Sequence, residues 1–162
     1  MARRATAILD LSSGQVVSKD AKSSTEGGFA RLIPELHVND LAQSLAFWRD
    51  LCGFKILFER EEERFVFLEH EGAQLMLCQR HGRYETGPMD SPFGRGAMFQ
   101  IYLDDIATLF AALTAARWPL YDSVREHWYR AGDRENGLRQ IMVQDPDGYL
   151  VMFAQRLGSR PV

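Results

Sequence analysis

Histidine and cysteine are the side chains best suited to bind a transition metal or to act as a nucleophile, and this chain has four histidines and two cysteines. The histidines are dispersed, at His37, His70, His81 and His127. None are paired at the HxH or HExxH spacing of a zinc site. Cys52 and Cys78 lack CxxC spacing, which favours buried, reduced thiols. No local motif for metal binding or nucleophilic attack is therefore present.

The binding of a flat or charged ligand is the other chemistry that the residue types indicate. Phe65 and Phe67 alternate along one predicted strand, so one face of that strand is aromatic. The segment 125–135 is dense in aromatic and charged residues, among them Trp128, Tyr129 and Arg130. Aromatic faces and carboxylates together suit a flat cation. Packing within the protein is the alternative role for each ring, and an ion pair is the alternative for Arg130.

Composition limits the class of protein. The length of 162 residues, 46% hydrophobic and 25% charged, is that of one globular domain. No apolar run approaches the ~20 residues of a membrane helix, and the N-terminus lacks a signal-peptide core. We therefore expect a cytoplasmic protein without a membrane partner. The net charge of −3 argues against a nucleic-acid partner and mildly favours a cationic ligand.

The hydrophobic pattern predicts the same series of elements twice. Residues 1–28 are polar and predicted to be a flexible N-terminal extension, residues 29–157 a single domain, and residues 158–162 a C-terminal tail. The first half is predicted to contain strands 31–38, 54–59, 64–70 and 73–80 and a helix over 39–51 that ends at Gly53. The second half is predicted to contain strands 97–103, 124–130, 138–144 and 149–155 and a helix over 106–113. A turn is predicted at 145–148.

This repetition predicts an α+β fold of two βαβββ modules, about 29–80 and about 97–157. Each module buries one face of its sheet. We expect the two modules together to form a cup-shaped mixed sheet with the helices outside.

Two segments of the sequence resemble a known superfamily. Residues 34–54 (PELHVNDL, then SLAFW and LCGF) and residues 143–153 (VQDPDGYLVMF) resemble the glyoxalase/bleomycin-resistance/dioxygenase, or vicinal-oxygen-chelate, superfamily over about residues 30–157. The resemblance implies two βαβββ modules, a homodimer and a ligand cavity in the concave face of the sheet.

The resemblance also implies where a catalytic metal would bind in this superfamily. Matching the motifs residue by residue places the ligand positions at Ile33, Met76, Met98 and Met152. None offers the nitrogen or oxygen donor that a hard or borderline ion needs; thioethers suit only soft ions such as Cu(I), and methionines are more often apolar fillers. We therefore expect no metal and no cofactor.

Without a metal, the resemblance points to the bleomycin-resistance members, which sequester a flat, cationic antibiotic at a dimer cleft. The residues predicted to bind the ligand are His37, Phe65, Phe67, Met76, Phe93, Met98, Gln100, Tyr102, Trp128, Tyr129, Arg130 and Met152. His37 is expected to hold an anionic part of the ligand, or else to be a hydrogen-bonded histidine of the surface or dimer interface. The Trp that drug-binding members carry before the Asp-Pro-Asp-Gly turn is missing, so either Trp128 substitutes for it or the ligand is not bleomycin.

Two alternatives stay open. The first is a glyoxalase- or dioxygenase-type enzyme with an unrecognised substrate, whose metal ligands come from His37, Gln74 and Gln100. The second is a module of a larger regulatory assembly, tethered by residues 1–28.

Overall fold

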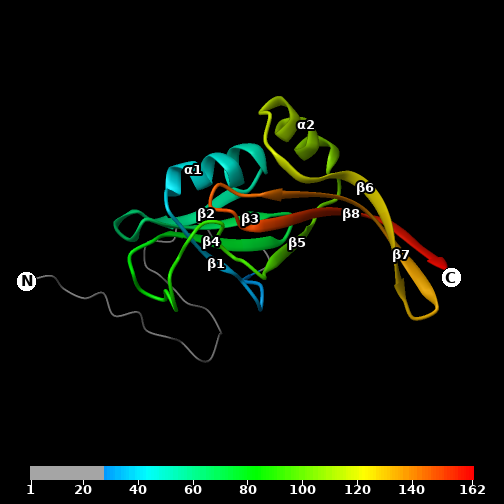
Figure 1. Ribbon diagram of the computed structural model, residues 1–162, viewed down its shortest axis with the longest axis horizontal. Coiled ribbons are helices and arrows are strands. Elements are labelled where there is room, and N and C mark those ends of the chain that lie inside the picture. Colours follow the sequence, from blue (N-terminus) through cyan, green and yellow to red (C-terminus); the bar gives the residue numbers. More distant parts are fainter. Residues whose placement is uncertain (1–27) are drawn as a thin grey trace, which may run out of the picture.

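The computed structural model describes residues 28–162, so the predicted extension, apart from Gly28, lies outside the described residues. Figure 1 shows two layers, with both helices on one side of the strands. The first module consists of β1 (Glu35–Val38), α1 (Leu41–Leu45) continued by a π-helical turn (Ala46–Leu51), β2 (Lys55–Arg60), a 3-10 turn (Glu61–Glu63), β3 (Phe65–His70) and β4 (Ala73–Gln79). The second consists of β5 (Met98–Tyr102), α2 (Ala107–Ala115), β6 (Leu120–Ala131), β7 (Arg134–Gln144) and β8 (Leu150–Pro161).

The two modules have the same topology. Their strand orders are β1-β4-β3-β2 and β5-β8-β7-β6, so each module is a four-stranded sheet of its own. The first strand of each is parallel to the last, and the other pairs are antiparallel. The prediction of an α+β fold made of two βαβββ modules is thus confirmed.

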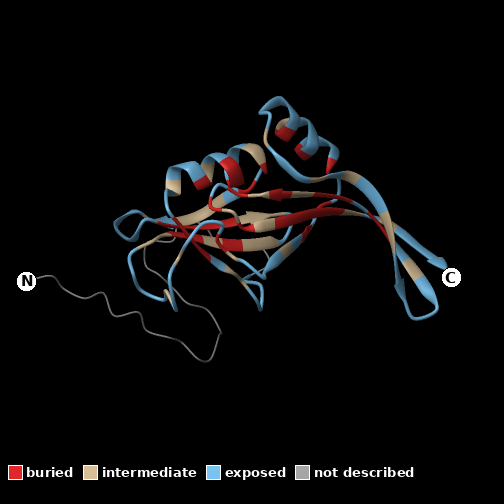
Figure 2. Cartoon of the chain, viewed as in Figure 1, coloured by how far each residue is buried: buried red, intermediate tan, exposed pale blue. Residues whose placement is uncertain are grey.

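The main hydrophobic core lies between the sheets and the helices. Alternation directs one set of strand residues, such as Leu36, Leu77 and Phe153, toward Trp48 and Leu113 on the helical side. Figure 2 shows buried residues in red along the strands and on both helices. The opposite face of each sheet is called here the helix-distal face. Because the helices do not cover it, this face is available for ligand binding. No helix of the described residues is long and apolar enough to cross a membrane.

Two buried carboxylates join the modules. Asp145 Oδ2 accepts a hydrogen bond from Trp48 Nε1 at 3.2 Å. Asp147 Oδ1 accepts bonds from the backbone N and from Nδ2 of Asn39 at 3.0 and 2.7 Å, and its Oδ2 accepts one from Ser44 Oγ. Both carboxylates belong to the turn predicted at 145–148, and they fix it against the first helix.

The pH dependence of stability provides a test of this burial. Desolvation is the main cause that raises the pKa of Asp145 to about 6 from its ordinary 3.8. The folded state therefore binds a proton more readily than the unfolded chain. This carboxyl alone makes the free energy of unfolding fall, by on the order of 3 kcal/mol, as the pH rises through that interval. We expect Asp145→Asn to lose this component in urea titrations at several pH values, and a stability difference between variant and wild type that is the same at every pH would contradict the assignment.

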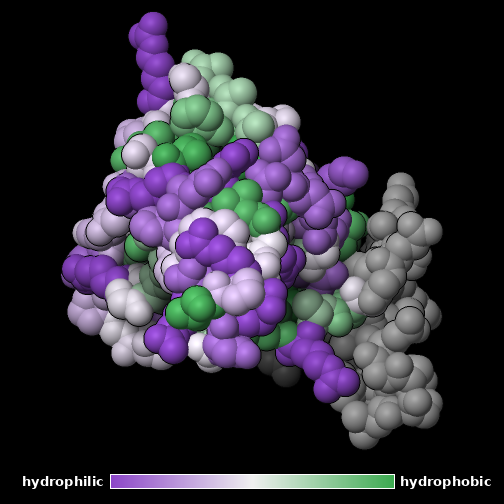
Figure 3. Space-filling model, turned by 90° about the vertical axis from the view of Figure 1, so that its right-hand side faces the viewer, coloured by the Kyte–Doolittle hydropathy of each residue, from purple (hydrophilic) through white to green (hydrophobic). Residues whose placement is uncertain are grey.

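The strands β6, β7 and β8 extend past the rest of the domain as an arm, residues 124–139 and 155–161 (Figure 1). Register pairs Glu135 with Arg160 and Arg134 with Pro161, so the prediction of a tail at 158–162 was wrong. Polar residues without alternation resemble a tail, but here the β7 ladder and an Arg160–Glu135 ion pair of 2.7 Å hold them. Seen from the arm's end, the surface is largely polar with isolated apolar residues (Figure 3).

Candidate functional site

A cavity of about 520 Å³ opens at the end of β1, within the size range of small-molecule sites. It is lined by Glu35, His37, Tyr84, Met89 and Tyr149. Strand alternation explains the first two, because Leu36 and Val38 are buried in the core and their neighbours face away from it.

The polar contacts of the cavity orient its side chains. His37, 9% exposed, lies with Nε2 3.2 Å from Glu35 Oε1. Tyr149 donates from its hydroxyl to the backbone oxygen of His37 at 3.0 Å. Burial raises the pKa of Tyr149 to about 12, so this phenol stays a neutral donor. One carboxylate and two phenol rings thus face a shared space.

The rim of the cavity comes from the loop between the modules. Tyr84 is 80% exposed, and its ring centroid lies 6.4 Å from that of His37. Arg80 fixes this loop: its Nε and Nη2 each donate to a carboxylate oxygen of Glu85 at 3.0 Å, and its Nη1 donates to Asn39 Oδ1 at 3.2 Å. The Arg80 hydrogen bond also lowers the pKa of Glu85. An exposed aromatic ring on a loop held in place by hydrogen bonds is suited to stack on a flat ligand.

An apolar cluster continues the helix-distal face beside the cavity. Register places Met76 next to Glu35, and Cys78 next to His37. The cluster, called here the module-one cluster, consists of Phe65, Phe67 and Cys78 with Ile33, Leu57, Phe58 and Met76 packed against them. Burial raises the pKa of the Cys78 thiol, so it is neutral and not a nucleophile. The structure therefore brings together four of the predicted ligand-binding residues on one face, His37, Phe65, Phe67 and Met76.

Five further predicted residues lie on the second module. Met98, Gln100 and Tyr102 alternate along β5, and register places Gln100 next to Met152. Gln100 Nε2 donates to the Tyr102 hydroxyl at 2.8 Å, and the Tyr129 hydroxyl donates to Gln140 Oε1 at 3.0 Å. Gln100 and Tyr102 line a hollow of about 370 Å³ that shares no lining residue with the His37 cavity. Within one chain, Met98, Gln100, Tyr102 and Met152 form a separate group on β5 and β8, whereas Tyr129 lies in the arm.

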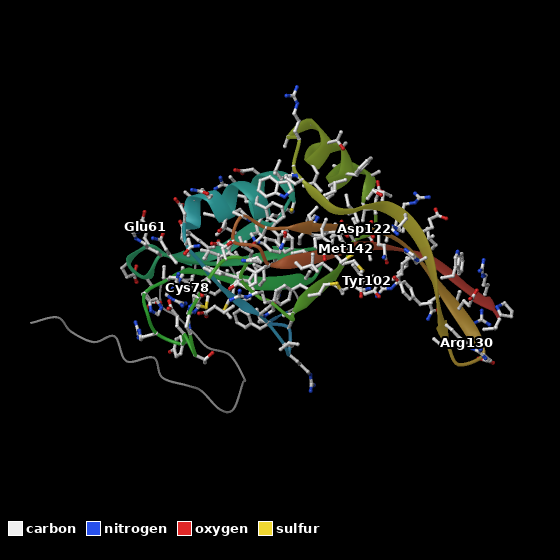
Figure 4. The ribbon with its side chains drawn as sticks, viewed as in Figure 1. Glu61, Cys78, Tyr102, Asp122, Arg130 and Met142 are labelled. Atoms are coloured by element: carbon white, nitrogen blue, oxygen red, sulfur yellow. The ribbon has the colours of Figure 1, made fainter. Side chains whose placement is uncertain are left out.

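Three of the predicted ligand-binding residues, Phe93, Trp128 and Arg130, do not line the His37 cavity. Phe93 is 4% exposed and part of the core, where its ring lies 6.0 Å from that of Tyr149. Trp128 lies in the arm, with the Arg160 guanidinium 4.0 Å from its ring. Arg130, whose Nε donates to the backbone oxygen of Gly132, is at the arm's tip, far from Cys78 and Tyr102 (Figure 4). The long β6–β7 hairpin carries Trp128 and Arg130 outward, and neither residue lines the His37 cavity.

Replacing Trp128 tests whether this residue belongs to the ligand site. The ring covers Gly137, whose added Cβ would lie 2.8 Å from it, and it stacks with Arg160. We expect Trp128→Ala to lower the free energy of unfolding by about 1–2 kcal/mol through lost contacts in the arm. Affinity for any ligand of the His37 cavity is expected to stay within about twofold in an equilibrium titration. A tenfold loss of affinity would restore Trp128 to the site.

The sequence offers Tyr84 and Met89 as candidates in the loop between the modules, and both line the cavity, whereas Glu35 and Tyr149 are cavity residues that it does not indicate as candidates. The position of Glu35 could have been predicted from the sequence, because a residue two positions before His37 on a strand faces the same side. The position of Tyr149 could not, because Tyr149 reaches the cavity only when the two modules pack together.

The residues at the superfamily's metal positions do not fit a hard or borderline metal ion. Ile33 and Met76 belong to the module-one cluster, while Met98 and Met152 lie on the second module. They supply one alkyl group and three thioethers, with no imidazole or carboxylate. Across residues 28–162, no three His, Cys, Asp or Glu side chains are grouped to hold an ion.

The structure is that of a two-module βαβββ protein with a cavity of small-molecule size beside β1. A model of the Glyoxalase/Bleomycin resistance protein/Dioxygenase superfamily matches residues 32–153, and the chain belongs to this superfamily.

Individual relatives agree with this membership. A probable lactoylglutathione lyase of Vibrio parahaemolyticus is 30% identical over 129 residues, which is 74% of this chain and 86% of that protein. A solved protein of unknown function from Agrobacterium tumefaciens is 22% identical, with a TM-score of 0.59 over 80% of this chain and 96% of that one. A solved lactoylglutathione lyase from the same organism is 19% identical, with a TM-score of 0.52 over 78% and 93%. The two structures show a shared fold.

Proposed function

We propose that this protein binds a small, flat, cationic molecule stoichiometrically in the His37 cavity, without a metal and without turnover, as an antibiotic-sequestering member of the superfamily. The observation that carries the proposal is the cavity's lining: one carboxylate, Glu35, between aromatic rings in a space of about 520 Å³. A carboxylate attracts a cation, and the exposed ring of Tyr84 offers a face to a planar ring.

The donor set at the superfamily's metal positions supports binding over metal-dependent catalysis. Ile33, Met76, Met98 and Met152 cannot activate a substrate oxygen through a hard ion. What stays in the cavity is suited to hold a ligand by charge and stacking. As in the superfamily at large, we propose that the protein acts as a homodimer in the cytoplasm and has no nucleic-acid partner.

A matched pair of ligands tests this proposal. 9-Aminoacridine is cationic at neutral pH, while acridine has the same flat ring system and is neutral there. We expect 9-aminoacridine to saturate at one molecule per chain in a fluorescence titration and to bind about tenfold more tightly than acridine. Equal affinities for the two dyes would show that the charge of the ligand does not contribute to binding. If neither dye binds, the cavity is not a site for flat ligands.

A second function is favoured by the 30% identical relative, named a probable lactoylglutathione lyase. The His37–Glu35 pair, 3.2 Å apart, has the geometry of an acid–base pair. The test is formation of lactoylglutathione by purified protein, with and without added Ni²⁺ or Zn²⁺. Turnover that is lost in His37→Gln would establish the enzyme; no turnover in either condition leaves binding as the function.

A further inference from the structure

The ring of Phe29 rests on the module-one cluster. Its centroid lies 5.3 Å from that of Phe67 and 6.4 Å from that of Phe58, with interplanar angles of 70° and 87°. Phe58 and Phe67 themselves stack at 4.9 Å and 20°. Phe29 therefore meets the paired rings edge-on, the arrangement that the aromatic quadrupole favours.

Gln74 fastens the backbone on both sides of Phe29. Its Nε2 donates to the backbone oxygen of Gly28 at 3.0 Å, and its Oε1 accepts from the backbone N of Ala30 at 2.8 Å. Gln74 lies on β4 two residues before Met76, so both side chains project from the helix-distal face. Two kinds of contact thus seat one ring: aromatic packing and a pair of amide hydrogen bonds.

We propose that the module-one cluster is a subsite for an aryl group of the ligand, and that Phe29 fills this subsite when no ligand is bound. The inference rests on the proposed function, since it extends the ligand of the His37 cavity onto the adjacent face, where Met76 pairs with Glu35. Phe29 shows which chemistry the surface accepts, an unsubstituted aromatic ring. Phe29 is 46% exposed, so a ligand ring reaches it from solvent and exchanges with it.

The subsite has features that a planar ligand ring would use. Phe65 and Phe67 are 3% and 2% exposed and fixed by β4 on one side and β2 on the other. At the rim, the Arg60 guanidinium lies 3.7 Å from the centroid of Phe65. A ligand with a cationic group and a second aryl ring would contact Glu35 with the first and displace Phe29 with the second. Self-occupancy then lowers the affinity for every such ligand, because Phe29 must leave first.

The test uses N-phenyl-1-naphthylamine, a neutral aryl dye whose fluorescence rises in apolar surroundings. Because the dye has no charge, its binding does not depend on the carboxylate of the proposed function, and the two ideas can fail separately. We expect Phe29→Ala to bind the dye about tenfold more tightly than wild type, as removal of a competing aromatic contact allows. Gln74→Ala is expected to change affinity in the same direction by a smaller factor.

Leu32→Ala is the control, because Leu32 lies three residues on in the same segment and is 86% exposed. It is expected to leave dye affinity unchanged. In hydrogen exchange of the wild type, the Ala30 amide should exchange faster when dye is bound. Equal or weaker dye binding by Phe29→Ala, or an Ala30 amide that the dye leaves unchanged, would overturn the proposal.

Discussion

Glu35→Gln is expected to weaken binding of 9-aminoacridine by about 10- to 100-fold while leaving acridine binding nearly unchanged. The substitution keeps the shape of the side chain and removes its charge, and a partly desolvated ionic hydrogen bond contributes about 1.5–3 kcal/mol. Glu35 is suited to this role because it faces the cavity beside His37, with its side chain 32% exposed. The comparison of two dyes in two proteins isolates the charge from the stacking.

The matched control for this result is Glu61→Gln. Glu61 is an exposed residue of the 3-10 turn Glu61–Glu63, and it does not line the cavity. Glu61→Gln removes the same charge as Glu35→Gln, so its effect on affinity measures any long-range influence of net charge on a cationic dye. Equal losses in the two variants would show that the attraction is general and that Glu35 makes no specific contact.

The second large effect is expected from Gly148→Ala, which should lower the free energy of unfolding by about 3 kcal/mol or more. Gly148 has φ of +93°, where a side chain is strained, and an added Cβ would lie 2.7 Å from Pro92 Cα and 3.2 Å from Phe93 N. These are backbone atoms, which cannot rotate away. Because Phe93 N also donates to Asp147 O, the clash would disturb the junction of the modules.

Gly132→Ala separates strain from clash in that measurement. Gly132 has φ of +70° at the arm's tip, and nothing lies within 4 Å of its added Cβ. We expect this variant to lose only about 1 kcal/mol in urea unfolding. Equal losses for the two glycines would mean that the loop around Pro92 yields, and that the contact between turn and loop is not rigid.

Much of the fold follows from local patterns in the sequence. The helical stripe that includes Trp48, the positive-φ Gly53 after it and the turn at 145–148 are each encoded within a few residues, and each is present in the structure. The first helix begins with Asp40 as its N-cap, and Asp40 Oδ1 accepts hydrogen bonds from the backbone N of Ala42 and Gln43. Repetition of this pattern then identified two modules.

The arm could not be predicted in the same way. Apart from the buried Gly137 and Leu138, its residues are exposed or half-buried on both faces of the strands, so Arg125, Arg130 and Arg134 give no clear alternation between polar and apolar residues. Pairing between β7 and β8 determines the length, and the ladder bonds residues as distant in sequence as Arg134 and Pro161. The sequence signal therefore ended where core burial ends.

The candidate site was predicted in part because strand faces have a period of two. His37, Phe65, Phe67 and Met76 share a face for that reason, whereas the ring of Tyr149 meets His37 only through contact between modules. Phe93 lies in a Pro-containing loop, which the sequence predicts to be exposed, yet its ring is buried in the core beside Tyr149. Long-range packing decides both cases.

The most direct test of metal-free sequestration is an isothermal titration of metal-analysed protein with bleomycin, in its metal-free and copper-bound forms. Metal-free sequestration predicts saturation at one ligand per chain with no metal in the protein, and a marked loss of affinity in Glu35→Gln. No binding of either form, together with lactoylglutathione formation that appears when Ni²⁺ or Zn²⁺ is added, would contradict it and make the chain a metal-dependent enzyme.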